Sequence, residues 1–257
     1  MKNEKPSVKS FGNIKNIKNY YPEAVSNREL YFFDTNVWLY ILNPGFEKKI
    51  GKDYLDFWAS LVELHLRKQN TKFKPKVVMT SVLFSEILHA HIKKRMLPNY
   101  LKQEWKSNRV YWEAQYYASK KYTGKSEKET PNIDFKQFKH WFIQSTFTKN
   151  GGNFYGFLHY KKTIHFKNHL GYLNARFKQA SPYTEVGKHI SFNYETMVDI
   201  ISKFKNGGID TNAGVNDYYF YYYCRKLGIP LVTNDRDFAC QDLRIITANE
   251  KLLALKE

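Results

Sequence analysis

Two short apolar runs, one near each end of the chain, stop at acidic residues, and this pattern limits the possible folds most strongly. Residues 30–33 (LYFF) end at Asp34, and residues 229–233 (IPLVT) lead into Asn234 and Asp235. Continuous apolar runs of this length are typical of strands that are buried on both faces. Each run lies beside a segment with helical features, and strands that alternate with helices form a parallel sheet with helices on both faces. We therefore expect an α/β fold.

Other segments near the two ends fit the same alternation. Apolar residues recur at three- and four-residue steps over residues 52–68, which predicts a helix with one buried face. Residues 77–79 (VVM) form another apolar run, and Thr80 and Ser81 after it can cap a helix that reaches about residue 95. The remaining expected elements are a helix from a cap at Asn216 to about Gly228 and a strand within residues 243–247.

The middle of the chain shows no alternation of strands and helices. Helical patterns occur around residues 100–121, 134–147 and 193–205, and the pair Gly151-Gly152 indicates a loop. A chain of 257 residues can hold one large domain or one domain with a long insertion. The expected organisation is a polar N-terminal arm (1–28), the first half of the α/β core (29–95), a basic, aromatic-rich, mostly helical insertion (96–206) and the second half of the core (207–257).

Positive charge is concentrated in this middle part. The chain holds 41 lysines and arginines against 24 acidic residues, a net charge of +17, and residues 91–205 alone contribute a net +13. Such a field attracts phosphate backbones, although solubility or an anionic membrane surface would also account for charge alone. The charge footprint favours nucleic acid. The lysines that we expect to hold a substrate are Lys120, Lys121, Lys161 and Lys162, and nearby aromatic side chains either stack on unpaired bases or fill a small core.

The cysteines and the hydropathy indicate a reducing compartment and no membrane span. Cys224 and Cys240 form no CxxC pair and have no histidines at zinc-ligand spacing, so reduced thiols are expected. The lysine-rich N-terminus lacks an apolar stretch, and no run approaches 18 apolar residues. We expect a cytoplasmic protein.

Four acidic positions share one place in the predicted topology. Asp34 and Asp235 follow strands, Glu86 lies in the second turn of a helix that follows a strand, and Asp217 opens a helix. Strand carboxyl ends and helix N-termini lie at the same edge of a parallel sheet, where ligands bind in open α/β folds. The four carboxylates are therefore expected to converge.

A cluster of like charges is costly unless a cation compensates it, and oxygen ligands favour Mg²⁺ or Mn²⁺. No zinc-type set competes, because His89 and His91 lie on different faces of their helix. Each acid alone has a simpler explanation: Asp34, Asp235 or Asp237 as turn residues, Glu86 as a solvated helix residue, and Asp217 as a partner of the helix dipole.

The chain resembles a PIN domain at these positions. The matching segments are residues 32–36 (FFDTN) with Trp38, residues 80–88, residues 215–218 (VNDY) and residues 231–238 (LVTNDRDF), of which the last is the most specific. The resemblance covers residues 29–95 and 207–250 and implies a PIN-like, Rossmann-like sheet. PIN domains are usually much shorter, and the middle 110 residues match nothing in the family.

The resemblance implies roles for individual residues. Asp34, Glu86, Asp217 and Asp235 match the acidic quartet of the family and would be catalytic. The metal ligands would be Asp34 and Asp217, with either Asp235 or Asp237 as the nearer third ligand. Asn36, Ser81 and Thr233 match positions that commonly support the site.

The implied activity is that of an Mg²⁺- or Mn²⁺-dependent endoribonuclease, which hydrolyses RNA phosphodiester bonds with a metal-activated water and leaves a 5′-phosphate. Many bacterial PIN proteins are VapC-type toxins restrained by an antitoxin, so the expected partners are RNA, with an antitoxin or a second copy of the chain as further candidates. Two alternatives stay open: an RNA-processing or DNA-directed nuclease, and a PIN-like protein that binds nucleic acid without cutting it.

Overall fold

The fold consists of two units. The computed structural model describes residues 13–20, 29–42, 50–67, 74–92, 96–121, 133–147, 164–188, 190, 193–205, 214–239 and 242–256. By their contacts, Met1–Ile87 and Arg176–Glu257 form the first unit, and Leu88–Ala175 form the second.

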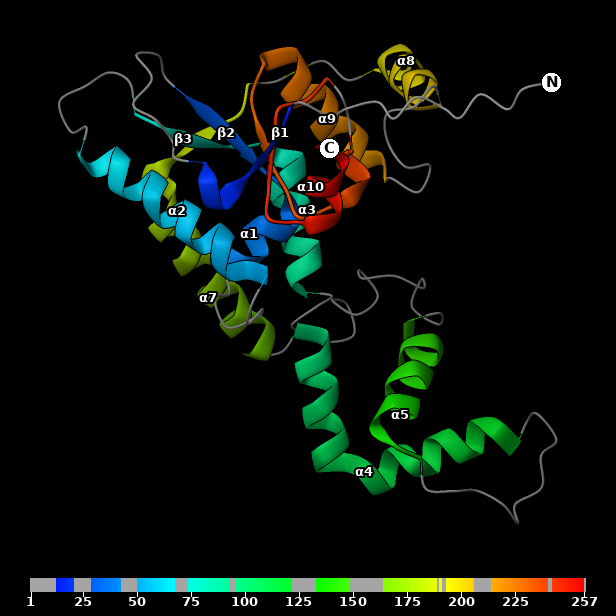
Figure 1. The fold of residues 1–257 in the computed structure, drawn as a ribbon. Helices are drawn as coiled ribbons and strands as arrows, with labels where there is room; N and C mark the ends of the chain where they lie inside the picture. Colours follow the sequence, from blue (N-terminus) through cyan, green and yellow to red (C-terminus); the bar gives the residue numbers. More distant parts are fainter. Residues whose placement is uncertain are drawn as a thin grey trace, which may run out of the picture. The chain divides into compact units, whose positions relative to one another are not determined.

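The first unit is built on a parallel sheet with helices around it (Figure 1). Within the described residues this sheet has six strands. The strand order is β1-β6-β5-β2-β3-β4, and every neighbouring pair is parallel. The strands are β1 (Ile14–Asn16), β2 (Leu30–Phe33), β3 (Lys76–Met79), β4 (Thr184–Val186), β5 (Leu231–Val232) and β6 (Ile245–Thr247). The predicted α/β class and parallel sheet are confirmed, and β2 and β5 lie side by side at the centre with their carboxyl ends at one edge.

Different helices cover the two faces of this sheet. Phe32 packs against Phe220 and Tyr223 of α9 (Val215–Leu227), with ring centroids 5.1 and 5.5 Å apart. Phe33, the next residue of β2, packs on the opposite face against Phe57 of α2 (Ile50–Arg67), at 6.0 Å. The helices that lie wholly in this unit are α1 (Thr35–Leu42), α2 (Ile50–Arg67), α8 (Tyr194–Lys205), α9 (Val215–Leu227) and α10 (Glu250–Leu253), while α3 (Ser81–His91) and α7 (Ile164–Ala180) cross its boundary.

Two strands come from segments without an apolar run. In the polar arm, Ile14 is fully buried and pairs with Ile245, which makes β1 an edge strand. The other edge strand, β4, is only partly buried and pairs with β3. It lies within residues 176–205, which the sequence pattern groups with the insertion and which the contacts place in the first unit. Each of these strands is three residues long and holds at most one buried residue, so no apolar run marks it in the sequence.

The helix starts at the carboxyl edge of the sheet are capped by neighbouring polar groups. The expected cap at Thr80 is confirmed, since the Leu83 N–H donates to Thr80 Oγ1 at 3.1 Å. The expected cap at Asn216 is wrong. Gly214 precedes α9 in an extended conformation, and its N–H donates to the Asp217 carboxylate at 2.7 Å. Capping thus comes from the third helical residue, which reaches back over the first turn.

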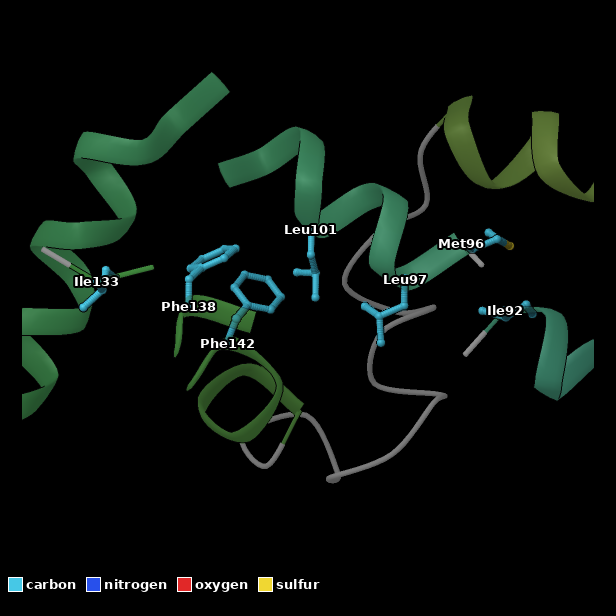
Figure 2. Close-up of a cluster of buried hydrophobic side chains, with 7 residues drawn as sticks. All are labelled: Ile92, Met96, Leu97, Leu101, Ile133, Phe138 and Phe142. Carbon is cyan, nitrogen blue, oxygen red and sulfur yellow. The ribbon is translucent and has the colours of Figure 1, made fainter. Parts of the chain in front are cut away.

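The second unit has a core of its own (Figure 2). It contains α4 (Leu97–Lys121), which departs from helical geometry at Asn108, and α5 (Phe135–Phe142), followed by a π-helical turn (Ile143–Phe147). Trp105, Trp112 and Trp141 all pack on Phe138, with ring centroids 4.8 to 6.4 Å apart. These aromatic residues therefore fill a core, one of the two roles that the sequence leaves open for them.

Two expectations from composition concern the whole chain. Cys224 is a buried thiol, as predicted, and Cys240 lies outside the described residues. Among the described helices, none combines the length and the apolar character that crossing a membrane requires.

Candidate metal centre

Asp34 lies at the point where β2 ends and α1 begins. Its N–H donates to the Val232 carbonyl of β5 at 3.0 Å, and its own carbonyl accepts the Trp38 N–H at 3.1 Å. The side chain is 3% exposed. Its Oδ2 accepts a hydrogen bond from Thr233 Oγ1 at 3.0 Å, while Asn36 Nδ2 lies at a longer 3.4 Å. The backbone of two strands thus places this carboxylate inside the protein.

Burial and neighbouring carboxylates raise the pKa of Asp34 to about 7. Burial is the largest cause, because a charged group loses its hydration in the interior. The negative charges of Asp235 and Glu86, and more weakly of Asp217, add to the increase, whereas the Thr233 hydroxyl lowers it. Acidic side chains from three other segments therefore act on one buried carboxyl group.

Asp217 occupies the first turn of α9 and is half-buried. Burial raises its pKa, and the charges of Asp235 and Asp237 raise it further, while the hydrogen bond from the Gly214 N–H has the opposite effect. The helix N-terminus and this hydrogen bond favour the ionised carboxylate. Asp217 is thus held in place by the backbone while facing two other acids.

Asp235 and Asp237 follow β5 and have different neighbours. Asp235 caps the short 3₁₀ helix Arg236–Phe238, and its Oδ1 accepts the Asp237 N–H at 3.0 Å. The charge of Asp235 acts on both Asp34 and Asp217, while that of Asp237 acts on Asp217. Of the two residues, Asp235 is therefore the one whose charge acts both on the acid at the end of β2 and on the acid at the start of α9.

The expected supporting residues differ in what they contact. Thr233 is fully buried and joins two acids, since its Oγ1 donates to Asp34 and accepts the Asp235 N–H at 2.9 Å. Asn36 Nδ2 lies 3.4 Å from Asp34 Oδ2, so this contact is weaker. Ser81 is exposed at the first residue of α3, and its neighbour Thr80 provides the cap.

The expected substrate-binding lysines fall outside what can be described. Lys120 and Lys121 lie in α4, but their side chains are outside the described part of the structure. Lys161 and Lys162 lie outside the described residues altogether.

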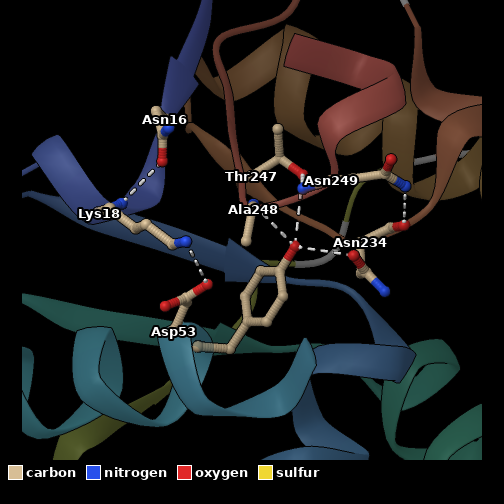
Figure 3. A network of polar contacts seen from close by, with 8 residues as sticks. Asn16, Lys18, Asp53, Asn234, Thr247, Ala248 and Asn249 are labelled. Atoms are coloured by element: carbon tan, nitrogen blue, oxygen red, sulfur yellow. Dashed lines mark hydrogen bonds and ion pairs between the residues drawn. The ribbon is translucent and has the colours of Figure 1, made fainter. Parts of the chain in front are cut away.

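A buried network around Tyr54 was not predicted as part of the site (Figure 3). The Tyr54 hydroxyl lies 2.9 Å from the Thr233 carbonyl oxygen and accepts the Ala248 N–H at 3.0 Å. It also lies within 3.3 Å of Asn234 Oδ1 and Thr247 Oγ1. In the sequence, Tyr54 is one more member of the apolar face of its helix, so no pattern distinguishes it from a core residue.

The oxygen ligands of the candidate site fit a hard cation, but the carboxylates do not lie close enough together to coordinate one. In the described ranges, no three histidine, cysteine or acidic side chains are grouped closely enough to hold a metal ion as they stand. Asp34, Asp217 and Asp235 nevertheless make no ion pair with another described residue, so their negative charge lacks a cationic partner there. All their donors are oxygens, which Mg²⁺ and Mn²⁺ prefer.

Comparison with other proteins adds no relative. The chain matches none of the known family models, curated proteins or solved structures with which it was compared. The fold and the acidic site therefore carry the functional argument.

Proposed function

We propose that this protein is a PIN-like ribonuclease that hydrolyses RNA phosphodiester bonds with the help of Mg²⁺ or Mn²⁺. One observation carries the proposal: burial, together with the charges of three acids from other segments of the chain, raises the pKa of the Asp34 carboxyl group. These acids are Asp235, Glu86 and Asp217. A fold does not tolerate this arrangement without cost, and a divalent cation would compensate it.

In this proposal the acidic residues share the work. Asp34, Asp217 and Asp235 would hold the cation, with Asp237 as an outer neighbour and Glu86 holding a water. Asp34 would be fixed by Thr233, and Asp217 by the Gly214 N–H. When bound, such a cation lowers the pKa of a coordinated water and neutralises charge that develops on the phosphate.

The charge of the protein supports a nucleic acid as the substrate. Beyond the net charge of +17, Lys102 and Lys106 lie at i and i+4 of α4, before its break at Asn108, so they share one face of that helix. Both are exposed, as is Arg109 beyond the break, which is paired with Glu113 at 2.9 Å. Lys102 and Lys106 make no ion pair within the described part of the chain, so they are available to phosphate groups.

The biological setting is a separate part of the proposal. A role as a toxin or defence effector, restrained by an antitoxin, follows only from the resemblance to PIN-domain toxins. The alternatives are an RNA-processing or DNA-directed nuclease and a protein that binds nucleic acid without cutting it. The complete acidic quartet favours the two catalytic roles.

Cleavage of defined substrates tests the proposal. Purified protein is incubated with single-stranded RNA or single-stranded DNA, with Mn²⁺ or with excess EDTA. We expect RNA cleavage that requires the cation and that falls at least 100-fold in Asp34→Asn, since an amide is a poor ligand for hard cations. Asp56→Asn, at an exposed position of α2, is the matched control and should keep full activity. Cleavage that is equal in EDTA and in Mn²⁺ would contradict the proposal. Cleavage of DNA but not of RNA would show that the substrate is DNA.

A further inference from the structure

Thr233 is held at each of its polar atoms. Its N–H donates to the Ile246 carbonyl of β6 at 3.1 Å, and its Oγ1 lies between Asp34 and the Asp235 N–H, as described above. Its remaining polar atom, the carbonyl oxygen, accepts from the Tyr54 hydroxyl at 2.9 Å. Because Thr233 joins the two acids, any group that fixes Thr233 also fixes their relative position.

The Tyr54 hydroxyl has one proton to donate and several acceptors around it. The Thr233 carbonyl oxygen is nearer than Asn234 Oδ1, at 2.9 against 3.2 Å, so the proton goes to Thr233. The lone pairs of the hydroxyl then accept from Ala248 N–H and are within reach of Thr247 Oγ1. Burial raises the pKa of Tyr54, so the hydroxyl keeps its proton.

The ring of Tyr54 is itself fixed. It stacks on Tyr40 of α1, with centroids 5.7 Å apart, and the Tyr40 hydroxyl accepts from Asn234 Nδ2 at 3.3 Å. Asn249 Nδ2 in turn donates to the Asn234 carbonyl at 2.7 Å, as Figure 3 shows. The segments after β5 and β6 are thus joined to α1 and α2 around one hydroxyl group.

We propose that Tyr54 is a positioning residue of the metal centre: its hydroxyl fixes the Thr233 carbonyl, and Thr233 in turn fixes the Asp34 carboxylate relative to Asp235. This inference rests on the proposed function, because it assigns Tyr54 a role in a centre that holds a cation. Groups that orient the ligands of a metal commonly change its affinity 10- to 100-fold when they are removed. A purely structural tyrosine would change stability alone.

The test is the affinity of the full-length protein for Mn²⁺, measured by titration calorimetry without any substrate. For Tyr54→Phe we expect Mn²⁺ binding that is about 10-fold weaker than in the wild type. Tyr31→Phe is the matched control. Tyr31 is also fully buried, and its hydroxyl donates to Glu29 Oε2 at 2.7 Å. Glu29 precedes the amino end of β2, whereas Asp34 follows its carboxyl end. This control should lower the melting temperature without changing the Mn²⁺ affinity.

Further variants test whether Tyr54 acts through Thr233. Thr233→Val should weaken Mn²⁺ binding as well, and adding Tyr54→Phe to it should cost little more, because Tyr54 acts through Thr233. Tyr40→Phe disturbs the same network more mildly and should weaken binding in the same direction. Unchanged Mn²⁺ affinity in Tyr54→Phe and Tyr40→Phe overturns the inference alone. A wild-type protein that binds no Mn²⁺ overturns the proposed function and this inference with it.

Discussion

The carboxyl group of Asp34 is buried where three other carboxylates act on it, and this makes the ionised form costly. Its pKa of about 7 in the fold compares with an ordinary value of 3.8. A carboxyl group whose pKa is raised by folding stabilises the fold fully below its unfolded pKa, and this contribution is lost as the pH rises toward the folded value. Without a cation, the protein therefore loses stability between about pH 4 and pH 7 through this residue.

Asp34→Asn should remove this loss. Asparagine cannot ionise, and its carbonyl oxygen can still accept from Thr233. Measured by urea unfolding in EDTA, the stability that the substitution adds should be roughly 2–3 kcal/mol larger at pH 8 than at pH 5, because each unit of pKa shift is worth about 1.4 kcal/mol. Asp56→Asn should show no such difference. An effect of Asp34→Asn that is the same at both pH values would show that folding does not raise the pKa of this carboxyl group.

At the scale of secondary structure, the sequence predicts the elements that carry an apolar signal. The run at residues 30–33 coincides with β2, and the periodic segment at 52–68 nearly coincides with α2. Asp34 and Asp235 can be predicted as site residues because each comes directly after such a run or one residue beyond it. The edge strands β1 and β4 have no comparable signal, and neither does Tyr54, whose contacts depend on residues about 180 to 195 positions away. Long-range polar contacts of this kind leave no local pattern in a sequence.

The close approach of β4 to its neighbours gives a prediction for one glycine. A Cβ at Gly187 would lie 2.7 Å from both Thr80 Cγ2 and the Tyr223 hydroxyl. Gly187→Ala should therefore lower the free energy of unfolding by about 1–3 kcal/mol through overpacking. Gly171→Ala in α7, where no atom lies within 4 Å, should be neutral or stabilise by up to about 1 kcal/mol. Chemical denaturation of both variants checks this, and equal effects would rule out a tight contact at Gly187.

The basic residues of α4 and α5 give a prediction about substrate binding. Lys102, Lys106 and Lys136 are exposed, so reversing them to glutamate in the Asp34→Asn background should weaken RNA binding. The slope of log affinity against log salt should become flatter by up to about 2, at roughly 0.7 for each lost contact with a single strand. The matched control reverses Lys15, Lys52 and Lys251, which are exposed in the first unit. Equal slopes in the two triple variants would mean that these helices do not hold the RNA.

At the scale of the whole molecule, the chain contains two separately packed cores. The first surrounds the parallel sheet, and the second gathers around Phe138 and Phe142. All the acids of the candidate site belong to the first unit, whereas 11 of the 17 net positive charges lie in residues 88–175, the second unit. This division predicts that the proposed metal centre and much of the positive charge can be disturbed independently.

Phe138→Ala tests this independence. Removing a fully buried ring that packs against three tryptophans should destabilise the second unit by about 3–5 kcal/mol. Thermal unfolding followed by tryptophan fluorescence should shift to lower temperature, while Mn²⁺ affinity measured below that transition should stay unchanged. Loss of Mn²⁺ binding under these conditions would show that the two units do not behave independently.

The central claim is that the acids at the carboxyl edge of the sheet form a metal centre, and locating a bound ion tests it most directly. Crystals of the wild-type protein grown with Mn²⁺ would be examined by anomalous diffraction at the manganese edge. We predict an ion at about 2.0–2.3 Å from an Asp34 oxygen and from an oxygen of Asp217 or Asp235, a distance typical of oxygen ligands to such cations. An anomalous map with no ion at Asp34, although Mn²⁺ is bound elsewhere or the carboxylates are paired with lysines, would contradict the account.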